Sequence, residues 1–160
     1  MDELLIEIRD TFFELNHTVG SFDPARFNTV PFPGSWTPGQ VADHIIRFAS
    51  GLPDATTAPA NRPFDEKVGM LRQIFLDYSQ KFETPDFVAP GAGPFELLAV
   101  LEAFDQAQNN LSAKVRAGNL EVLCMGLEVP VFGYLTRYEW IRFILVHIQR
   151  HVHQLKLMQV

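Results

Sequence analysis

Apolar residues recur at intervals of three and four along several stretches of the chain, which is the spacing of one face of an α-helix. The first such stretch covers residues 2–20 and begins with two acidic residues. Acidic side chains stabilise the positive end of a helix dipole. The pattern therefore predicts an amphipathic helix over 2–20, whose inward face carries Leu5, Ile8, Phe12, Leu15 and Val19.

Two later segments are typical of helix N-termini. Thr37 precedes Pro38 and is followed by Gln40, and Thr136 is followed in the same way by Glu139. In such a capping box, the side chains of the first and fourth residues each bond the backbone amide of the other, and proline suits the first helical position. These motifs predict one helix starting after each threonine.

Weaker patterns fill the rest of the chain. Helical spacing returns at residues 65–82, where Gly69 lowers the helix propensity, and again at residues 94–117. The stretch 119–135 is compatible either with a short hairpin around Met125-Gly126 or with a packed loop. The remaining segments are rich in Pro, Gly and small polar residues and are predicted loops: residues 21–36, 51–63 and 85–94.

These elements together predict an all-α fold, because little strand is expected and amphipathic helices bury their apolar faces against one another in a bundle. With 160 residues, we expect a single domain over residues 1–160. The 47% hydrophobic and 20% charged content is that of a globular protein. No repeat or low-complexity tract is present.

Charge and cysteine content exclude several classes of function. The net charge of −6, without a local basic cluster, argues against nucleic acid as a partner. A single cysteine, Cys124, allows no intramolecular disulfide and no cysteine-rich metal site. The N-terminus does not resemble a signal peptide, and no apolar run is long enough to cross a membrane. We therefore expect a cytoplasmic location and no membrane partner.

Three histidines lie on apolar helix faces. His147 and His151 are four residues apart on the last predicted helix and so share one face. His44 shares a face with Val41 and Ile45. A buried imidazole without a partner costs roughly 1–3 kcal/mol. One divalent metal held by all three would explain them together and would leave a coordination position open, as in catalytic sites; the alternative is three hydrogen-bonded core histidines.

Other candidate residues are less well placed for such a site. His153 is rotated away from the pair, and His17 lies off the apolar stripe of its helix. Gln154 is on the correct side to orient a ligand or a bound water. Asp43 is expected to be a solvated surface acid, with an acceptor beside His44 as the alternative. Cys124 is expected to be a buried small apolar residue or an incidental thiol.

Two segments resemble the DinB/YfiT-like superfamily, which includes metal-dependent enzymes. Ser35–Ile45 is similar to a helix start led by a tryptophan, Trp36, with a histidine eight residues later. Phe132–Leu155 is similar to an FG-x-LT…EW…H-x3-H-x2-QL ending found in one branch of the superfamily. The resemblance implies a four-helix bundle with an additional helix or long insertion between the second and penultimate bundle helices.

The resemblance also carries expectations for the site. It implies a divalent ion, nickel, zinc or iron, held by His44, His147 and His151 and open to water. Relatives include thiol-dependent S-transferases and a mycothiol-dependent isomerase, and homodimers are common among them. One feature departs from that branch: a His-Pro pair often precedes the Phe-Gly, whereas this chain has Val129-Pro130-Val131. A role for that histidine is therefore absent here.

Two hypotheses of function follow. The first is a metal-dependent enzyme of the thiol S-transferase or hydrolase type that acts on a small-molecule substrate. A low-molecular-weight thiol would be its further cofactor, Gln154 would assist the site, and the protein would form a homodimer. The second is a non-catalytic metal-binding or stress-associated protein in which the metal is structural.

Overall fold

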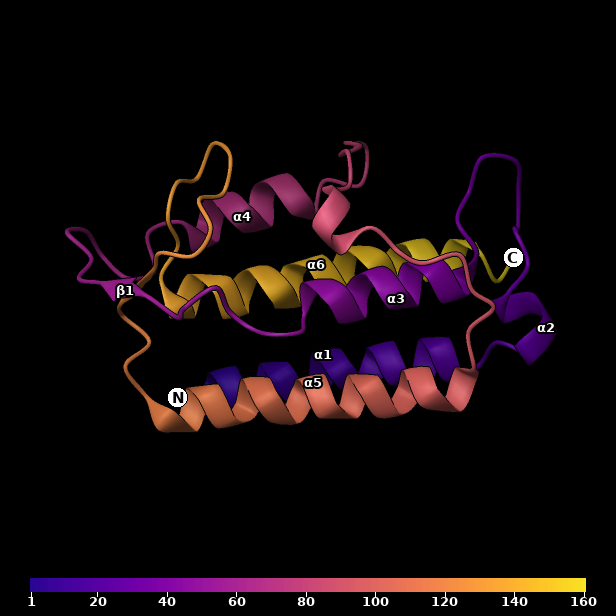
Figure 1. Cartoon of the computed structure of the whole chain (residues 1–160), viewed down its shortest axis with the longest axis horizontal. Coiled ribbons are helices and arrows are strands. Elements are labelled where there is room, and N and C mark those ends of the chain that lie inside the picture. Colours follow the sequence, from indigo (N-terminus) through magenta and orange to yellow (C-terminus); the bar gives the residue numbers. More distant parts are fainter.

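Four long helices pack side by side in the computed structural model, which describes residues 1–160 (Figure 1). In Figure 1, α1 and α5 form the lower layer and α3 and α6 the layer above; α1 and α6 run in one direction, α3 and α5 in the other. The predicted four-helix bundle is confirmed. The helices are α1 (Asp2–Gly20), α3 (Pro38–Phe48), α5 (Leu97–Ala117) and α6 (Arg137–Leu157).

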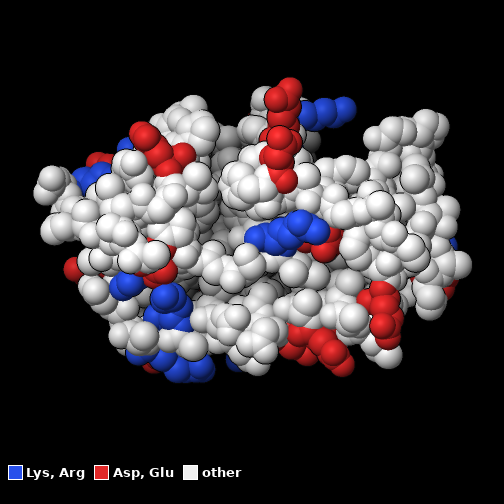
Figure 2. All heavy atoms as spheres, in the orientation of Figure 1, with Lys and Arg blue, Asp and Glu red and all other residues white.

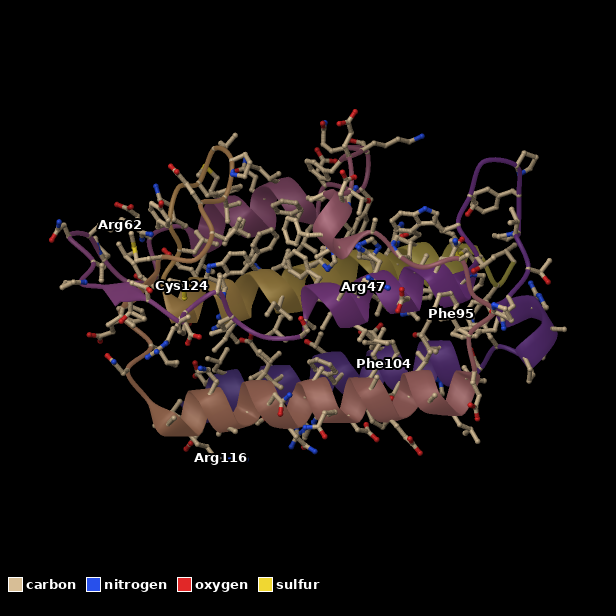
Figure 3. All side chains as sticks on the ribbon, viewed as in Figure 1. Arg47, Arg62, Phe95, Phe104, Arg116 and Cys124 are labelled. Carbon is tan, nitrogen blue, oxygen red and sulfur yellow. The ribbon has the colours of Figure 1, made fainter.

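The facing sides of these helices form the main hydrophobic core. Phe104 points from α5 into the space between the layers, whereas Arg116 points away from the bundle (Figure 3). Complete burial of one such large apolar side chain stabilises the fold by about 1.5–3 kcal/mol. The predicted inward face of the first helix is confirmed except at Leu5, which is only partly buried. Core residues with no solvent exposure include Ile8, Phe12, Leu15, Val19, Ile45, Phe104, Ile141, Ile144 and Ile148.

Both predicted capping boxes are present. The Thr37 hydroxyl accepts from the Gln40 backbone N–H, and the Gln40 side-chain oxygen accepts from the Thr37 N–H. Thr136 and Glu139 pair in the same way at the start of α6. These caps satisfy backbone donors that the first turn of a helix leaves free, which explains why α3 and α6 begin where the sequence predicts.

The fifth predicted helix is shorter than expected. Helical spacing predicted residues 65–82, but α4 covers only Val68–Phe75 and packs against α6. Arg150 of α6 donates to the carbonyl oxygens of Phe75 and Asp77 at 3.0 and 3.1 Å. The Asp77 carboxylate accepts from the Ser79 backbone N–H, which a continuing helix would have used. The long connection between α3 and α5 that contains α4 is the expected insertion.

The start of α5 is also later than predicted, at Leu97 rather than Pro94. The side chain of Asn28 accepts from the Phe95 N–H and donates to the Phe95 carbonyl, which keeps that residue out of the helix. Within the first turn of α5, Leu98 is 67% exposed although it is apolar.

Short elements lie within segments that were predicted to be irregular. β2 (Leu123–Cys124) pairs antiparallel with β1 (Thr57–Ala58), so the hairpin around Met125-Gly126 is not formed. The rest of residues 119–135 is a packed loop over a second, smaller apolar cluster. Two one-turn helices complete the chain, α2 (Pro24–Phe27) and η1 (Asp86–Val88).

On the side of the molecule that Figure 2 shows, neither positive nor negative charge dominates. Lys and Arg side chains stand next to Asp and Glu side chains there. Among the ion pairs of the structure, Asp54 accepts from both Lys114 and Arg137 at 2.8 Å. None of the helices combines length with enough apolar character to cross a membrane.

Candidate metal centre

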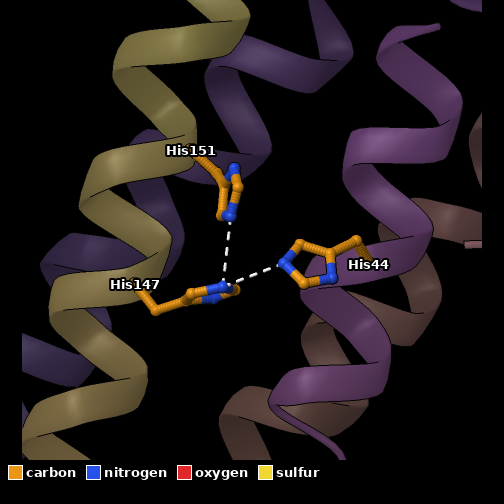
Figure 4. A group of neighbouring side chains, drawn as sticks. All are labelled: His44, His147 and His151. Atoms are coloured by element: carbon orange, nitrogen blue, oxygen red, sulfur yellow. Dashed lines mark hydrogen bonds between the residues drawn. The ribbon is translucent and has the colours of Figure 1, made fainter. Parts of the chain in front are cut away.

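Three histidines from two helices meet between α3 and α6 (Figure 4). His44 comes from α3, and His147 and His151 come from α6. The Nε2 atom of His147 lies 3.0 Å from Nε2 of His44 and 3.1 Å from Nε2 of His151. The structure thus brings together the three histidines that the sequence singled out.

Two of the rings are oriented by partners on their far side. Nδ1 of His44 is 2.7 Å from the carbonyl oxygen of Val88, and Nδ1 of His151 is 2.7 Å from Oε1 of Gln154. Both oxygens can only accept, so each Nδ1 carries the hydrogen and donates it. A neutral imidazole with hydrogen on Nδ1 has its lone pair on Nε2. His44 and His151 therefore both direct lone pairs at His147.

His147 has no such partner. Its ring stacks on Phe48, with 3.8 Å between ring centroids, and its Nδ1 is buried without a hydrogen bond. At most one hydrogen can sit on its Nε2, and that hydrogen cannot complete good hydrogen bonds to both His44 and His151. The protein alone therefore leaves the cluster with unsatisfied nitrogen atoms.

Burial keeps these imidazoles neutral. It lowers the pKa of His147 well below its usual value, and the neighbouring rings of His151 and His44 lower it further. Burial also lowers the pKa of His151 to about 3, with charge on His44 acting in the same direction. The pKa of His44 is lowered by burial as well, an effect that its hydrogen bond to Val88 partly offsets. All three rings thus keep their lone pairs at neutral pH.

The donor set fits a divalent cation. The three nitrogen atoms all lie within 4.8 Å of one another. Bonds of about 2.0–2.1 Å from imidazole nitrogen to zinc place neighbouring nitrogens roughly 3–3.6 Å apart, close to the two short separations here. Neutral imidazole suits zinc, nickel and iron, and a cation at this point would satisfy the converging lone pairs.

No carboxylate belongs to the cluster. Asp43 is adjacent to His44 in sequence, but its carboxylate accepts from Nε of Arg47 and from the backbone N–H of Gly91, both at 2.9 Å. The expectation that Asp43 is a solvated surface acid is wrong, since its side chain is 17% exposed and holds a loop. The Asp43 carboxylate is therefore bonded to Arg47 and Gly91 and does not face the histidines as a general base.

The remaining candidates lie outside the cluster. His153 is exposed and stacks on Tyr78 with 4.0 Å between ring centroids, and His17 stacks on Phe13. Cys124 is buried, as expected. Burial, together with the negative charge of Asp54, raises the pKa of its thiol to about 12, so the thiol stays protonated.

Comparisons with known proteins agree with this fold. The sequence profile of the DinB superfamily matches residues 7–155, nearly the whole chain. The chain belongs to the DinB superfamily. The crystal structure of TT2238, a four-helix bundle protein, is similar to this DinB-superfamily chain with a TM-score of 0.53. The two are 22% identical over 99% of this chain and 97% of that chain, which shows a shared fold alone. No curated protein matches the sequence.

Sequence reasoning missed one partner of the site in this DinB-superfamily chain. The Val88 carbonyl that orients His44 is a backbone group, and no side-chain pattern marks it in a sequence. Trp36 lies beside His44, with 5.4 Å between ring centroids, and its place in the Ser35–Ile45 motif was a usable signal. Phe48 was detectable too, since it follows His44 by one helical turn.

Proposed function

We propose that this protein is a metal-dependent enzyme in which His44, His147 and His151 bind a divalent cation and act on a small-molecule substrate. The observation that carries the proposal is the convergence of three neutral Nε2 atoms with no internal partner able to satisfy all of them. When bound, such a cation acts as a Lewis acid that makes a nearby thiol or water easier to deprotonate.

The residues of the chain prepare the site in separate ways. Val88 and Gln154 hold two rings in the tautomer that presents Nε2, and Phe48 covers the face of His147. His44 and His147 are only 4% and 7% exposed, whereas His151 is partly exposed, so a ligand reaches the cluster from the His151 side. Near-complete burial of two of the three rings favours a small molecule as the substrate.

The resemblance in sequence favours a thiol S-transferase or a hydrolase, with nickel, zinc or iron as the ion and a low-molecular-weight thiol as a further cofactor. No carboxylate base accompanies the histidines, and either reaction would therefore depend on the ion for activation of the nucleophile. The same resemblance leads us to propose a homodimer in the cytoplasm, which size-exclusion chromatography with light scattering tests for the oligomeric state.

Metal analysis of protein purified without a polyhistidine tag tests the central claim. We expect a stoichiometric divalent metal in the wild type and its loss in His151→Ala. His17→Ala is the matched control, because it removes the same side chain from an exposed position on α1, where it stacks on Phe13 and lies outside the cluster. Absence of metal from the wild type, even after incubation with nickel or zinc, would refute the proposal.

A structural metal is the second candidate, and the near-complete burial of His44 and His147 favours it. The two candidates differ in what His151→Ala does to the protein. For an enzyme, the variant loses thiol-transfer or hydrolytic activity with a small change in Tm. For a structural ion, it lowers Tm severely, because metal binding then supplies folding free energy.

A further inference from the structure

The segment between α4 and α5 passes over the metal-centre face of the bundle. We define its first part, residues 76–91, as the strap; in Figure 1 it leaves α4 and crosses α6 and α3 on its way to α5. Val88 is its one buried residue, and its aromatic side chains, Tyr78, Phe82 and Phe87, are 46%, 46% and 66% exposed. Because it buries so little apolar surface, the strap can open at a lower free-energy cost than the helices beneath it.

One end of the strap is tethered to α3. The Val88 carbonyl accepts from Nδ1 of His44, itself a residue of the metal centre. Three residues further along, the Gly91 N–H donates to the Asp43 carboxylate, and the Gly91 carbonyl accepts from the Gln40 side chain at 3.2 Å. All of these α3 residues lie within one turn of His44.

The other end is tethered to α6 by Arg150, which lies between His147 and His151 in sequence. Its guanidinium donates to the carbonyl oxygens of Phe75, Asp77 and Gln80. The ring of Phe82 lies 4.8 Å from the guanidinium carbon. Both helices that supply the histidines therefore also hold the strap.

We propose that the strap is a positioning element of the metal centre, and that its closure is coupled to cation binding through the hydrogen bond from His44 to Val88. This inference rests on the proposed function. With the strap closed, the hydrogen of His44 stays on Nδ1 and the lone pair on Nε2 faces His147. An open strap removes the acceptor and frees the ring to rotate. By reciprocity, a cation that holds Nε2 stabilises the closed strap.

Hydrogen exchange measured by mass spectrometry on metal-free protein tests the tether. His44→Ala removes the donor to Val88, whereas His147→Ala removes a neighbouring ring that makes no hydrogen bond or ring stacking contact with the strap. Loss of one hydrogen bond should speed exchange in peptides covering residues 85–91 roughly five- to tenfold in His44→Ala. His147→Ala should match the wild type.

Two outcomes would overturn the tether: an exchange rate in His44→Ala equal to that of the wild type, or an equal increase in both variants, which would mean general destabilisation. Circular dichroism establishes that each variant is folded. Because the hydrogen-exchange experiment uses metal-free protein, its result does not depend on whether the proposed function holds.

A second pair of variants tests the coupling. Arg150→Met removes two hydrogen bonds to the strap and a third to the Phe75 carbonyl at the end of α4, while Arg142→Met removes an arginine of the same helix that bonds Tyr138 and Glu7 instead. Competition with a chromogenic chelator should show zinc or nickel affinity lowered about tenfold in Arg150→Met and unchanged in Arg142→Met. Removal of the positive charge of Arg150 would by itself strengthen cation binding. A lower metal affinity in Arg150→Met therefore indicates an effect of the strap and not of the charge.

Unchanged metal affinity in Arg150→Met, together with faster exchange of the strap, would show that closure and binding are independent and would overturn the coupling. A wild type that binds no metal would overturn both the proposed function and the coupling. The hydrogen-exchange experiment would still show whether His44 holds the strap.

Discussion

The three imidazoles of the cluster are held in their orientations by different contacts. His44 relies on a backbone carbonyl and His151 on an amide side chain, whereas His147 is held only by stacking and packing. A partner on the far side of a metal-binding histidine typically changes metal affinity 10- to 100-fold when it is lost.

Replacement of Gln154 by leucine should therefore weaken zinc or nickel binding about tenfold, because the His151 ring loses the acceptor that selects its tautomer. Chelator competition measures this. Gln149→Leu is the control, since Gln149 is on the same helix and bonds none of the three histidines. Equal affinities of Gln154→Leu and the wild type would mean that packing alone orients His151.

Val131 is a residue in an unfavourable backbone conformation. Its φ is 75° and its side chain is 86% exposed, so a β-branched residue occupies a left-handed position without any packing in return. Val131→Gly should raise the free energy of unfolding by up to about 1 kcal/mol, since the left-handed region costs L-residues about 1–2 kcal/mol and glycine almost nothing. Urea denaturation provides the measurement.

Val30→Gly is the matched control, because Val30 is also exposed but has no positive φ. It should be neutral or destabilising, since glycine adds conformational freedom to the unfolded chain. If both glycine variants lose stability, the turn at Val131 is not strained.

At the scale of helices, the two capping boxes differ in what surrounds them. Gln40 caps α3 near the surface, whereas Glu139 is fully buried and also accepts from the guanidinium of Arg62 and from the Lys67 backbone N–H. One carboxylate thus joins the start of α6 to the segment that leads into α4. The ion pair with Arg62 is 2.7 Å long and mostly out of water.

Glu139→Ala should consequently destabilise the protein by about 3 kcal/mol, because it leaves Arg62 and two backbone donors without their buried acceptor. Gln40→Ala removes the equivalent side chain of the other box and one uncharged hydrogen bond to the Gly91 carbonyl, and should cost about 1 kcal/mol. Chemical denaturation of both variants gives the comparison. Equal losses would show that the contacts beyond the cap add nothing.

At the scale of the whole molecule, the buried histidines make stability depend on pH. In the unfolded chain each has a pKa of about 6.5 and takes up a proton as the pH falls below that value. In the folded, metal-free protein the lowered pKa values keep the rings neutral, down to about pH 3 for His151. Between these limits the unfolded state binds more protons, so acid favours unfolding.

The metal-free protein should therefore lose stability as the pH falls below 6.5, and His151 alone should contribute up to about 1.4 kcal/mol per pH unit between pH 6.5 and 4. Urea denaturation at a series of pH values measures the slope. His151→Ala removes one of the titrating groups and should give a shallower slope. Parallel slopes in the two proteins would mean that His151 is protonated in the folded state.

Much of the fold could be predicted because its signals are local. The apolar spacing of residues 2–20 and the caps at Thr37 and Thr136 act within a few residues, and these three helices form as expected. Helical geometry alone also put His147 and His151 on one face. The sequence thus determined the bundle helices and which histidines face inward.

Tertiary contacts decided the rest. Arg150 ends α4 from a distant helix, Asn28 delays the start of α5, and β1 finds its partner in β2 rather than in a local hairpin. Each of these contacts joins segments more than fifty residues apart, and one short-range pattern cannot encode such a pairing.

The candidate site was likewise predictable from the sequence only in part. The types and faces of its three histidines were readable from the chain, but their meeting point depends on how α3 packs on α6. The Val88 carbonyl was beyond prediction, because every residue carries the same backbone group and only the fold decides which one reaches a ring.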